Sequence, residues 1–487
     1  MDRLGVSKLP SISRFRHCCH IVIVNNNNQK MTVSTQTTES WSGRLAFVLA
    51  SIGAAVGLGN IWQFPANLGA SGGSAFILVY VLAILLVATP IMLAEMIIGR
   101  QTRLSAPSAM KSMAEQVGNS GRWSVVGWMG LCALFMVLGF YSVIAGWCAA
   151  YFFKIVSGAM NGLSPDQVGA DFGEFLASPG RMLFWHAAFS SITIFIVTRG
   201  VKVGLERVVR IAMPALLITL VLLVIYAGIT GDAATAYTFL FAADFSKLTP
   251  EIVLAAVGQA FFSVNVGVGA VLTYSAYLPK DVNLFRSAIA IASGDTLVAV
   301  LAGLAIFPIV FAYGLDPTEG AGLLFVTLST AFAQMPGGSI IGAAFFLMLI
   351  FAALTSLISM LETMTARAKE AKNISRTKAA IMIGTGSFLF GITTILSFSN
   401  WADLRPLGMF GTFANMNPFD LTIYIVQRVI MPIAGVLYAI FVGWWVSREV
   451  SLKEIGLEDG AIFKLWILLV RVIAPLAVGL LFVFNLA

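Results

Sequence analysis

The sequence predicts an all-α membrane protein with about eleven transmembrane helices. Hydrophobic residues make up 58% of the 487 residues, charged residues only 11%, and the mean hydropathy is +0.89. A soluble domain cannot bury that much apolar surface, whereas runs of about 20 apolar residues match a hydrocarbon layer roughly 30 Å thick. Helices are expected because every backbone polar group must be paired within lipid.

Apolar runs between charged or Gly/Pro-rich breaks define the predicted spans. They lie near residues 43–67, 73–98, 123–156, 182–198, 208–230, 251–277, 286–313, 340–366, 379–398, 419–446 and 462–485. The connections after the second, fourth and eighth spans are rich in Lys and Arg, and those after the third and seventh carry acidic residues. Basic short loops are typical of the cytoplasmic side, so the N-terminus is predicted inside and the C-terminus outside.

Residues 1–40 are predicted to form a disordered cytoplasmic tail. The run Ile21–Val24 is too short to span a bilayer, the tract Asn25–Asn28 is polar, and no cleavage pattern of a signal peptide is present. An alternative is that Met31 is the true start of the protein.

Composition argues against several other functional classes. The net charge of +7 comes from basic residues scattered through the loops, so no nucleic-acid partner is expected. Four cysteines and three histidines show neither a disulfide framework nor metal-ligand spacing. No nucleophile and base, phosphate loop or metal cluster suggests an enzyme, and no organic cofactor is expected.

Two predicted spans are interrupted by glycine at corresponding positions. Residues 53–60 read GAAVGLGN and residues 263–269 read SVNVGVG. Breaks five spans apart are typical of an inverted repeat with broken helices 1 and 6. The predicted repeats are residues 41–230 and 251–446, with residues 460–487 forming helix 11 outside them. Glycine also serves helix contacts, but both segments carry Asn, which is costly at membrane depth unless it faces a cavity or a partner.

Several segments resemble the neurotransmitter:sodium symporter family. In order along the chain they are WSGRL at 41–45, GAAVGLGNIWQFP at 53–65, GGSAF at 72–76, Glu95 with Gly99 and Arg100, GQAFFS at 258–263 and AALTS at 352–356. The resemblance extends from about residue 41 to 446 and implies the leucine-transporter fold. For a bacterial member it implies sodium-coupled import of a neutral amino acid or related zwitterion across the inner membrane by alternating access.

The resemblance also implies two sodium sites. A dehydrated sodium ion needs several oxygen ligands, and unwound helix backbone supplies carbonyl groups that a regular helix uses internally. The first site would be formed by Ala55, Asn60, Ser263 and Asp295. The second would be formed by Gly53, Val56, Ala352, Thr355 and Ser356. Alternatively, the two hydroxyl groups of the second set bond back to carbonyls of their own helix.

Asp295 is a carboxylate within an apolar span and therefore a functional candidate by default. By the resemblance, an acid in this position supplies the negative charge that chloride supplies in animal members. Chloride-independent transport is therefore expected, with proton antiport left open. The alternatives are that Asp295 ends a helix or pairs with Lys280.

A substrate carboxylate suits the unpaired N–H groups and the positive dipole end of a broken helix. By the resemblance, the Tyr141 hydroxyl would also bind this carboxylate, whereas many membrane tyrosines lie in interfacial belts instead. The predicted substrate residues are Ala55, Gly57, Gly59, Val137, Tyr141, Phe262, Ser263, Asn265, Val268, Ser356 and Met360. A medium or large neutral side chain is expected in this pocket.

The predicted gates are Phe262 as an aromatic lid, Gln63 with Asp420 as the outer gate, and Glu370 in the inner gate. Gln63 stands where the family has Arg, so a neutral hydrogen bond to Asp420 is expected. The family's basic partner of Glu370 is replaced by Thr38, and Arg44 or a lysine of the tail would have to substitute. The buried acids Glu95 and Glu362 are expected to brace the broken helices.

Two rival functions fit the same composition. A proton-coupled amino-acid or polyamine carrier of the same fold would not need two hydroxyl ligands for sodium. A channel or a ligand sensor would bind its ligand without transporting it against a gradient.

Overall fold

The computed structural model describes residues 40–242, 244–316 and 322–486, in which helix is the only regular secondary structure. The predicted tail, Met31 included, lies outside these residues except for its last residue. The helices of the first half are α1 (Arg44–Ala55), η1 (Gly59–Gln63), α2 (Phe64–Ala70), α3 (Ser74–Ala83), η2 (Ile84–Ala88), α4 (Thr89–Thr102), α5 (Ala106–Gln116), η3 (Gly121–Trp123), α6 (Ser124–Val156), α7 (Pro165–Leu176), α8 (Pro179–Thr198), η4 (Val201–Glu206), α9 (Arg207–Thr230) and α10 (Ala233–Phe241). Those of the second half are η5 (Phe245–Lys247), α11 (Pro250–Ser263), α12 (Ala270–Ala276), α13 (Leu284–Ala312), η6 (Leu323–Thr327), α14 (Leu328–Gln334), α15 (Gly338–Lys372), α16 (Arg376–Ser397), η7 (Gly411–Phe413), α17 (Pro418–Tyr424), η8 (Ile425–Ile430), α18 (Met431–Trp445), α19 (Arg448–Ile455), α20 (Ala461–Leu468), η9 (Leu469–Ile473) and α21 (Ala474–Leu486).

Within the described residues, nine continuous helical stretches are long and apolar enough to cross a membrane. Each of them overlaps one of the predicted spans, so hydropathy located these helices well. The stretch that corresponds to the fifth predicted span is longer than predicted, because the π-helical turn η4 precedes α9 and the helix starts at Val201.

The first and sixth predicted spans are interrupted. In the first, α1 and η1–α2 are bent by 52° across residues 56–58. In the sixth, α11 ends at Ser263 and α12 starts only at Ala270. Both interruptions fall in the predicted glycine-containing segments.

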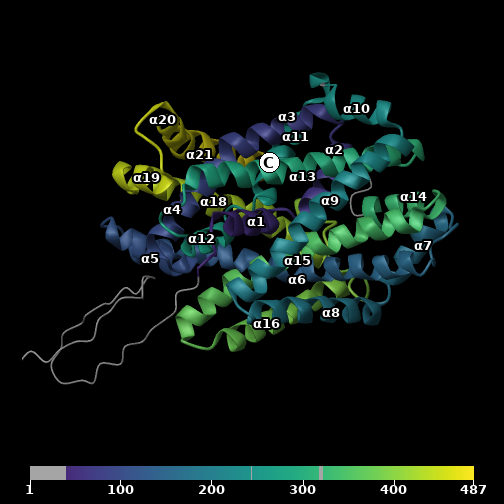
Figure 1. The fold of residues 1–487 in the computed structure, drawn as a ribbon, viewed down its shortest axis with the longest axis horizontal. Coiled ribbons are helices and arrows are strands. Elements are labelled where there is room, and N and C mark those ends of the chain that lie inside the picture. The colour runs from purple at the N-terminus through teal and green to yellow at the C-terminus, as the bar shows by residue number, and fades with distance from the viewer. Residues whose placement is uncertain (1–39, 243, 317–321, 487) are drawn as a thin grey trace, which may run out of the picture. The chain divides into compact units, whose positions relative to one another are not determined.

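The interrupted helices lie against long continuous ones (Figure 1). The helices α6, α8, α15 and α16 pack on one another, and α1 packs against α9, α13 and α15. Trp41 lies just before α1 and Asp420 lies in the first turn of α17, so we call the two ends of the helices the Trp41 end and the Asp420 end. The break in the first span lies between these ends.

Candidate functional site

The first break makes carbonyl groups of α1 available to other helices. Val56, directly after α1, has an extended conformation with φ −66° and ψ 108°. The Ser356 hydroxyl oxygen lies 3.4 Å from the Gly53 carbonyl oxygen and 3.3 Å from that of Val56. Asn265 Nδ2 donates to the Ala54 carbonyl at 2.6 Å. A regular helix would use these carbonyls internally, so the break is what lets side chains and ligands reach them.

The second break is built from residues with positive φ. Asn265, Gly267 and Gly269 have φ angles of +55°, +86° and +74°. Glycine is required at 267, because a Cβ atom there would lie 2.3 Å from the Met431 carbonyl oxygen. Glu95 Oε1 accepts a hydrogen bond from the Gly267 amide at 2.6 Å. This buried acid therefore braces the second break, as expected.

A buried polar cluster joins both breaks to α13. Asn60 Nδ2 donates to Ser263 Oγ at 2.9 Å and to Asp295 Oδ1 at 2.8 Å, and Ser263 Oγ donates to Asp295 Oδ2 at 2.5 Å. The sequence analysis missed Tyr80, whose hydroxyl lies 2.9 Å from Ser263 Oγ and donates to Asp295 Oδ2 at 3.2 Å. Ala55, the remaining residue of this predicted set, is buried at the end of α1. Asp295 thus faces other helices and does not end one.

The second predicted sodium set gathers where α1 meets α15. Ser356 lies on the carbonyls of α1, whereas the Thr355 hydroxyl bonds back to its own helix, at 3.1 Å to the Phe351 carbonyl and 3.0 Å to that of Ala352. Thr355 therefore bonds back to its own helix, as the alternative expects, whereas Ser356 contacts carbonyls of α1; sodium binding by this set stays a prediction. No group of three or more His, Cys, Asp or Glu side chains in the described segments could hold a metal ion, so any cation here would depend on carbonyl and hydroxyl oxygens.

Tyr141 faces the backbone just after the first break. Its hydroxyl accepts a hydrogen bond from the Leu58 amide at 2.6 Å. A Cβ atom at Gly57 would lie 2.2 Å from this hydroxyl oxygen and 2.8 Å from Ser356 Oγ, so a larger residue there would displace one of these two side chains. The Tyr141 hydroxyl and the Leu58 N–H group are therefore held together deep in the helices, and both are groups that can donate to a carboxylate.

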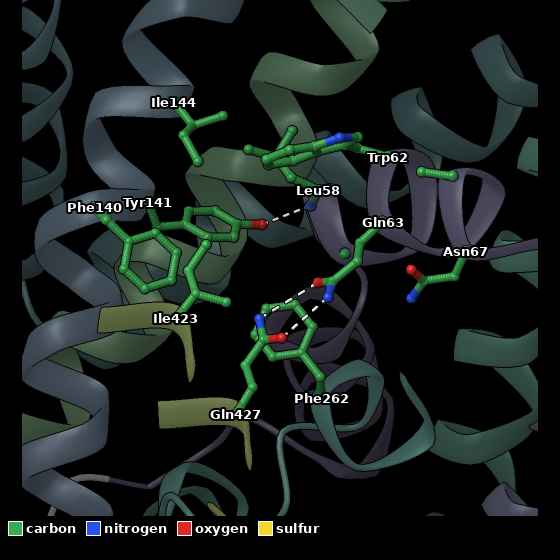
Figure 2. Close-up of a pocket in the computed structure, with 12 residues that line it drawn as sticks. Leu58, Trp62, Gln63, Asn67, Phe140, Tyr141, Ile144, Phe262, Ile423 and Gln427 are labelled. Atoms are coloured by element: carbon green, nitrogen blue, oxygen red, sulfur yellow. Dashed lines mark hydrogen bonds between the residues drawn. The ribbon is translucent and has the colours of Figure 1, made fainter. Parts of the chain in front are cut away.

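A cavity of about 160 Å³ lies beside Tyr141 (Figure 2). Its lining residues are Leu58, Gly59, Trp62, Gln63, Ala66, Asn67, Phe140, Tyr141, Ile144, Phe262, Ile423 and Gln427. Three predicted substrate residues line it: Gly59, Tyr141 and Phe262. The others are buried outside this lining: Ala55, Gly57, Val137, Ser263, Asn265, Val268, Ser356 and Met360. The predicted residues therefore do not share one open cavity in this structure.

The predicted pairing of Gln63 with Asp420 is wrong in this structure. Gln63 Nε2 donates to Gln427 Oε1 at 3.0 Å, and Gln427 Nε2 donates back to Gln63 Oε1 at 3.4 Å (Figure 2). Asp420 instead forms a capping box with Asn417 at the start of α17. A carboxylate in the first helical turn finds unpaired amides within reach, so it is satisfied locally. The sequence did offer a signal for the true partner of Gln63, because Gln427 is a polar residue inside a predicted span and therefore needs a partner.

The expected partner of Glu370 is also corrected. Its Oε2 accepts from the Ser105 amide at 2.8 Å and its Oε1 from Arg367 Nη1 at 3.4 Å. The partners of Glu370 are therefore the Ser105 amide, at the start of α5, and Arg367 of its own helix α15. Arg44 is not among them. A tail lysine lies outside the described residues.

Further charged side chains join helices at the Trp41 end. Glu362 accepts from the Tyr277 hydroxyl at 3.2 Å and is paired with Arg376, so it links α12, α15 and α16. Glu206 accepts from the Ser42 hydroxyl at 2.5 Å and pairs with Arg210 at 2.6 Å. These contacts fasten the segment before α1 to the start of the fifth span.

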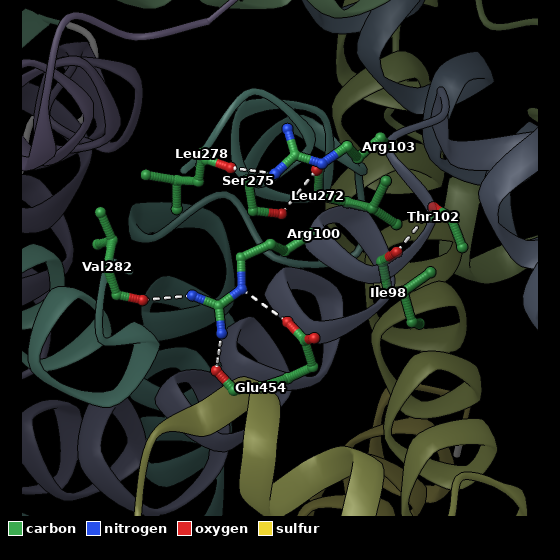
Figure 3. A network of polar contacts seen from close by, with 9 residues as sticks. All are labelled: Ile98, Arg100, Thr102, Arg103, Leu272, Ser275, Leu278, Val282 and Glu454. Carbon is green, nitrogen blue, oxygen red and sulfur yellow. Dashed lines mark hydrogen bonds and ion pairs between the residues drawn. The ribbon is translucent and has the colours of Figure 1, made fainter. Parts of the chain in front are cut away.

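Arg100 forms the most buried of these ion pairs (Figure 3). It is 4% exposed and its Nε lies 2.6 Å from Glu454 Oε2 of α19. It also donates to the main-chain carbonyls of Val282 and Glu454. Arg103 donates to the Leu278 carbonyl at 2.9 Å. Arg100, in the last turn of α4, and Arg103, directly after it, therefore hold the connection after α12, and Arg100 also binds α19.

Comparison with known proteins identifies related sequences over nearly the whole described chain. The Sodium:neurotransmitter symporter family matches residues 38–162 and 176–486. The chain is 39% identical over 453 residues to the sodium-dependent transporter YhdH of Bacillus subtilis, covering 92% of this chain and 98% of that protein. It is 31% identical over 463 residues to a sodium-dependent transporter of Haemophilus influenzae, covering 94% and 100%. The crystal structure of MhsT in complex with L-phenylalanine is similar, with a TM-score of 0.85, 41% identity and coverage of 91% and 99%.

Proposed function

Because the chain belongs to the sodium:neurotransmitter symporter family, a family of membrane transporters and not of enzymes, we propose that it imports a neutral amino acid or related zwitterion together with sodium. The similarity to MhsT supports the leucine-transporter fold and alternating access. The observation that carries the proposal is the Tyr141 hydroxyl held 2.6 Å from the Leu58 amide, between two polar assemblies at the breaks.

The first sodium ion would bind at Ala55, Asn60, Ser263 and Asp295. Burial of all four supports this assignment, since a charged group inside apolar helices requires a partner. Asn60 directs its amide nitrogen at Ser263 and Asp295, so ligation through its oxygen requires the amide to turn by 180°. The Asp295 charge is our reason to propose that transport does not need chloride.

The second sodium ion would bind at Gly53, Val56, Ala352, Thr355 and Ser356. The Ser356 hydroxyl already lies on two of these carbonyls. Thr355 would have to rotate away from its own helix to join them.

The substrate carboxylate would lie at Gly57, Gly59 and Tyr141, and its side chain would extend toward Phe262. MhsT was solved with L-phenylalanine, and the aromatic lining of the cavity supports a neutral side chain of similar kind. Binding would require the cavity to extend toward Val268 and Met360, which are buried here.

We propose that the Trp41 end faces the cytoplasm of a bacterial inner membrane and the Asp420 end faces outside. The basic loops after α4 and α8 lie at the Trp41 end and support this orientation. The repeats would be residues 41–230 and 251–446, which place one break in each half.

Uptake of L-phenylalanine and other neutral amino acids into proteoliposomes tests the proposal. An inward sodium gradient should drive accumulation, and replacing sodium by choline at fixed pH should abolish it. Thr355→Ala and Asn60→Ala should each raise the sodium concentration needed for half-maximal uptake at least about tenfold. Accumulation driven by a proton gradient alone would favour the proton-coupled carrier, and absence of exchange with preloaded substrate would favour a sensor or channel.

A further inference from the structure

The contact between Gln63 and Gln427 joins helical segments that are far apart in the sequence. Gln63 is the last residue of η1 and Gln427 lies within η8, and both segments are π-helical turns. Such turns are rare and occur frequently at functional sites. The two amides exchange hydrogen bonds of 3.0 and 3.4 Å, and both line the cavity beside Tyr141. The pair therefore lies where the segment after the first break meets the tenth span.

No charged side chain lines this cavity among the described residues. The charged residues nearest in sequence to Gln427 are engaged elsewhere, since Asp420 caps α17 and the Arg428 guanidinium lies 5.9 Å from the centre of the Tyr424 ring. A second amide contact lies about one turn further along α2, where Asn67 Nδ2 donates to Gln259 Oε1 at 3.0 Å. The polar side-chain groups of the lining residues are consequently neutral: three amides, the Tyr141 hydroxyl and the Trp62 indole N–H.

We propose that Gln63 and Gln427 form a neutral latch that closes the substrate cavity toward the outside. The proposal rests on the orientation and transport function proposed above. Hydrogen bonds between neutral groups contribute little net free energy each, and salt does not screen them as it screens ion pairs at an exposed gate. The latch therefore opens easily, closes over a neutral substrate and is insensitive to ionic strength.

Chemical labelling of Leu58→Cys, in a variant whose natural cysteines are replaced by serine, measures the opening of this latch. Leu58 lines the cavity on the break side of Gln63 and is 1% exposed. A membrane-impermeant maleimide added outside should react about five- to tenfold faster when Gln63→Leu or Gln427→Leu is introduced, because either removes both hydrogen bonds. Gln116→Leu on exposed α5 is the matched control and should leave the rate unchanged.

Ionic strength provides the second measurement. Between about 0.05 and 0.5 M choline chloride, the labelling rate with the natural pair should change less than about twofold. The double variant Gln63→Arg with Gln427→Glu should label slowly at low salt and at least about threefold faster at high salt. Native labelling rates in both leucine variants, or a strong salt dependence of the natural pair, would overturn the latch. If the labelling rates are as expected but the natural protein shows no sodium-driven uptake, the proposed function is overturned and the latch is not.

Discussion

The Trp41 end and the cavity beside Tyr141 are held closed by different chemistry. Four ion pairs lie at the Trp41 end: Arg100 with Glu454 and Glu362 with Arg376 join different helices, whereas Glu206 with Arg210 and Glu370 with Arg367 are neighbours in sequence. On the Asp420 side of the first break, the contact that crosses the cavity is an amide pair. A buried ion pair is costly to break one partner at a time, whereas a neutral hydrogen bond contributes only about 1 kcal/mol. The Trp41 end and the cavity therefore differ in how mutation and salt affect their opening.

The largest effect is expected at Arg100. Arg100→Ala leaves the Glu454 carboxylate uncompensated in a buried site, which should lower the free energy of unfolding by about 3–5 kcal/mol. Thermal unfolding of the purified protein in detergent measures this. Arg448→Ala is the control, because its pair with Asp459 is about half exposed and should contribute at most about 1 kcal/mol. Equal losses in both variants would remove the distinction between buried and exposed pairs at this end.

A smaller effect is expected at Ser42, whose hydroxyl group binds both Glu206 and Arg210. Ser42→Ala should make amide hydrogen exchange in α1 about tenfold faster, since one or two hydrogen bonds to charged groups are lost. Mass spectrometry of peptides from residues 44–55 provides the readout. Ser157→Ala removes an exposed hydroxyl bonded to its own helix and should leave exchange in α1 unchanged. Unchanged exchange in Ser42→Ala would mean that this cluster does not fasten α1.

Asp420 tests the corrected gate. Asp420→Ala removes half of the capping box and should destabilise α17 locally by about 1 kcal/mol, seen as faster hydrogen exchange in its first turn. Labelling of Leu58→Cys should stay at its native rate, because Asp420 does not hold Gln63. Asp403→Ala, in the loop before α17, should affect neither measurement. An increase in labelling with Asp420→Ala would restore the neutral contact of Gln63 with Asp420 that the sequence analysis expected.

The smallest effect is expected from salt on the Trp41 end. Raising choline chloride from about 0.05 to 0.5 M should speed exchange in α1 about twofold, because the Arg210 side of the Glu206 pair is largely exposed and therefore screened. The rate of cysteine labelling at the cavity should show no comparable change. A salt response of equal size at both ends would contradict the proposed difference between them.

Hydropathy and glycine placement predicted the helices and both breaks because they report on local requirements. A run of apolar residues must be long enough for the bilayer, and Gly267 occupies a backbone position that other residues fit poorly. The family resemblance likewise selected Asn60, Ser263 and Asp295, which the structure brings within hydrogen-bond distance. Their roles as sodium ligands stay predictions.

The sequence predicted less well which polar side chains contact one another. Tyr80 joins the polar cluster from α3, and no motif marked it, because a tyrosine in a span is equally consistent with an interfacial position. Gln63 meets Gln427 and not Asp420, since the carboxylate is satisfied by its own helix end. Which side chains meet depends on how helices hundreds of residues apart are rotated and shifted against each other.

By itself, the sequence determined that the chain forms membrane-spanning helices, two of them broken, because the cost of exposing apolar side chains and unpaired backbone groups is set residue by residue. Only the tertiary structure decided which polar groups satisfy one another at those breaks and at the two ends. A hydrogen bond requires two atoms within about 3 Å, and that distance is fixed by the packing of whole helices.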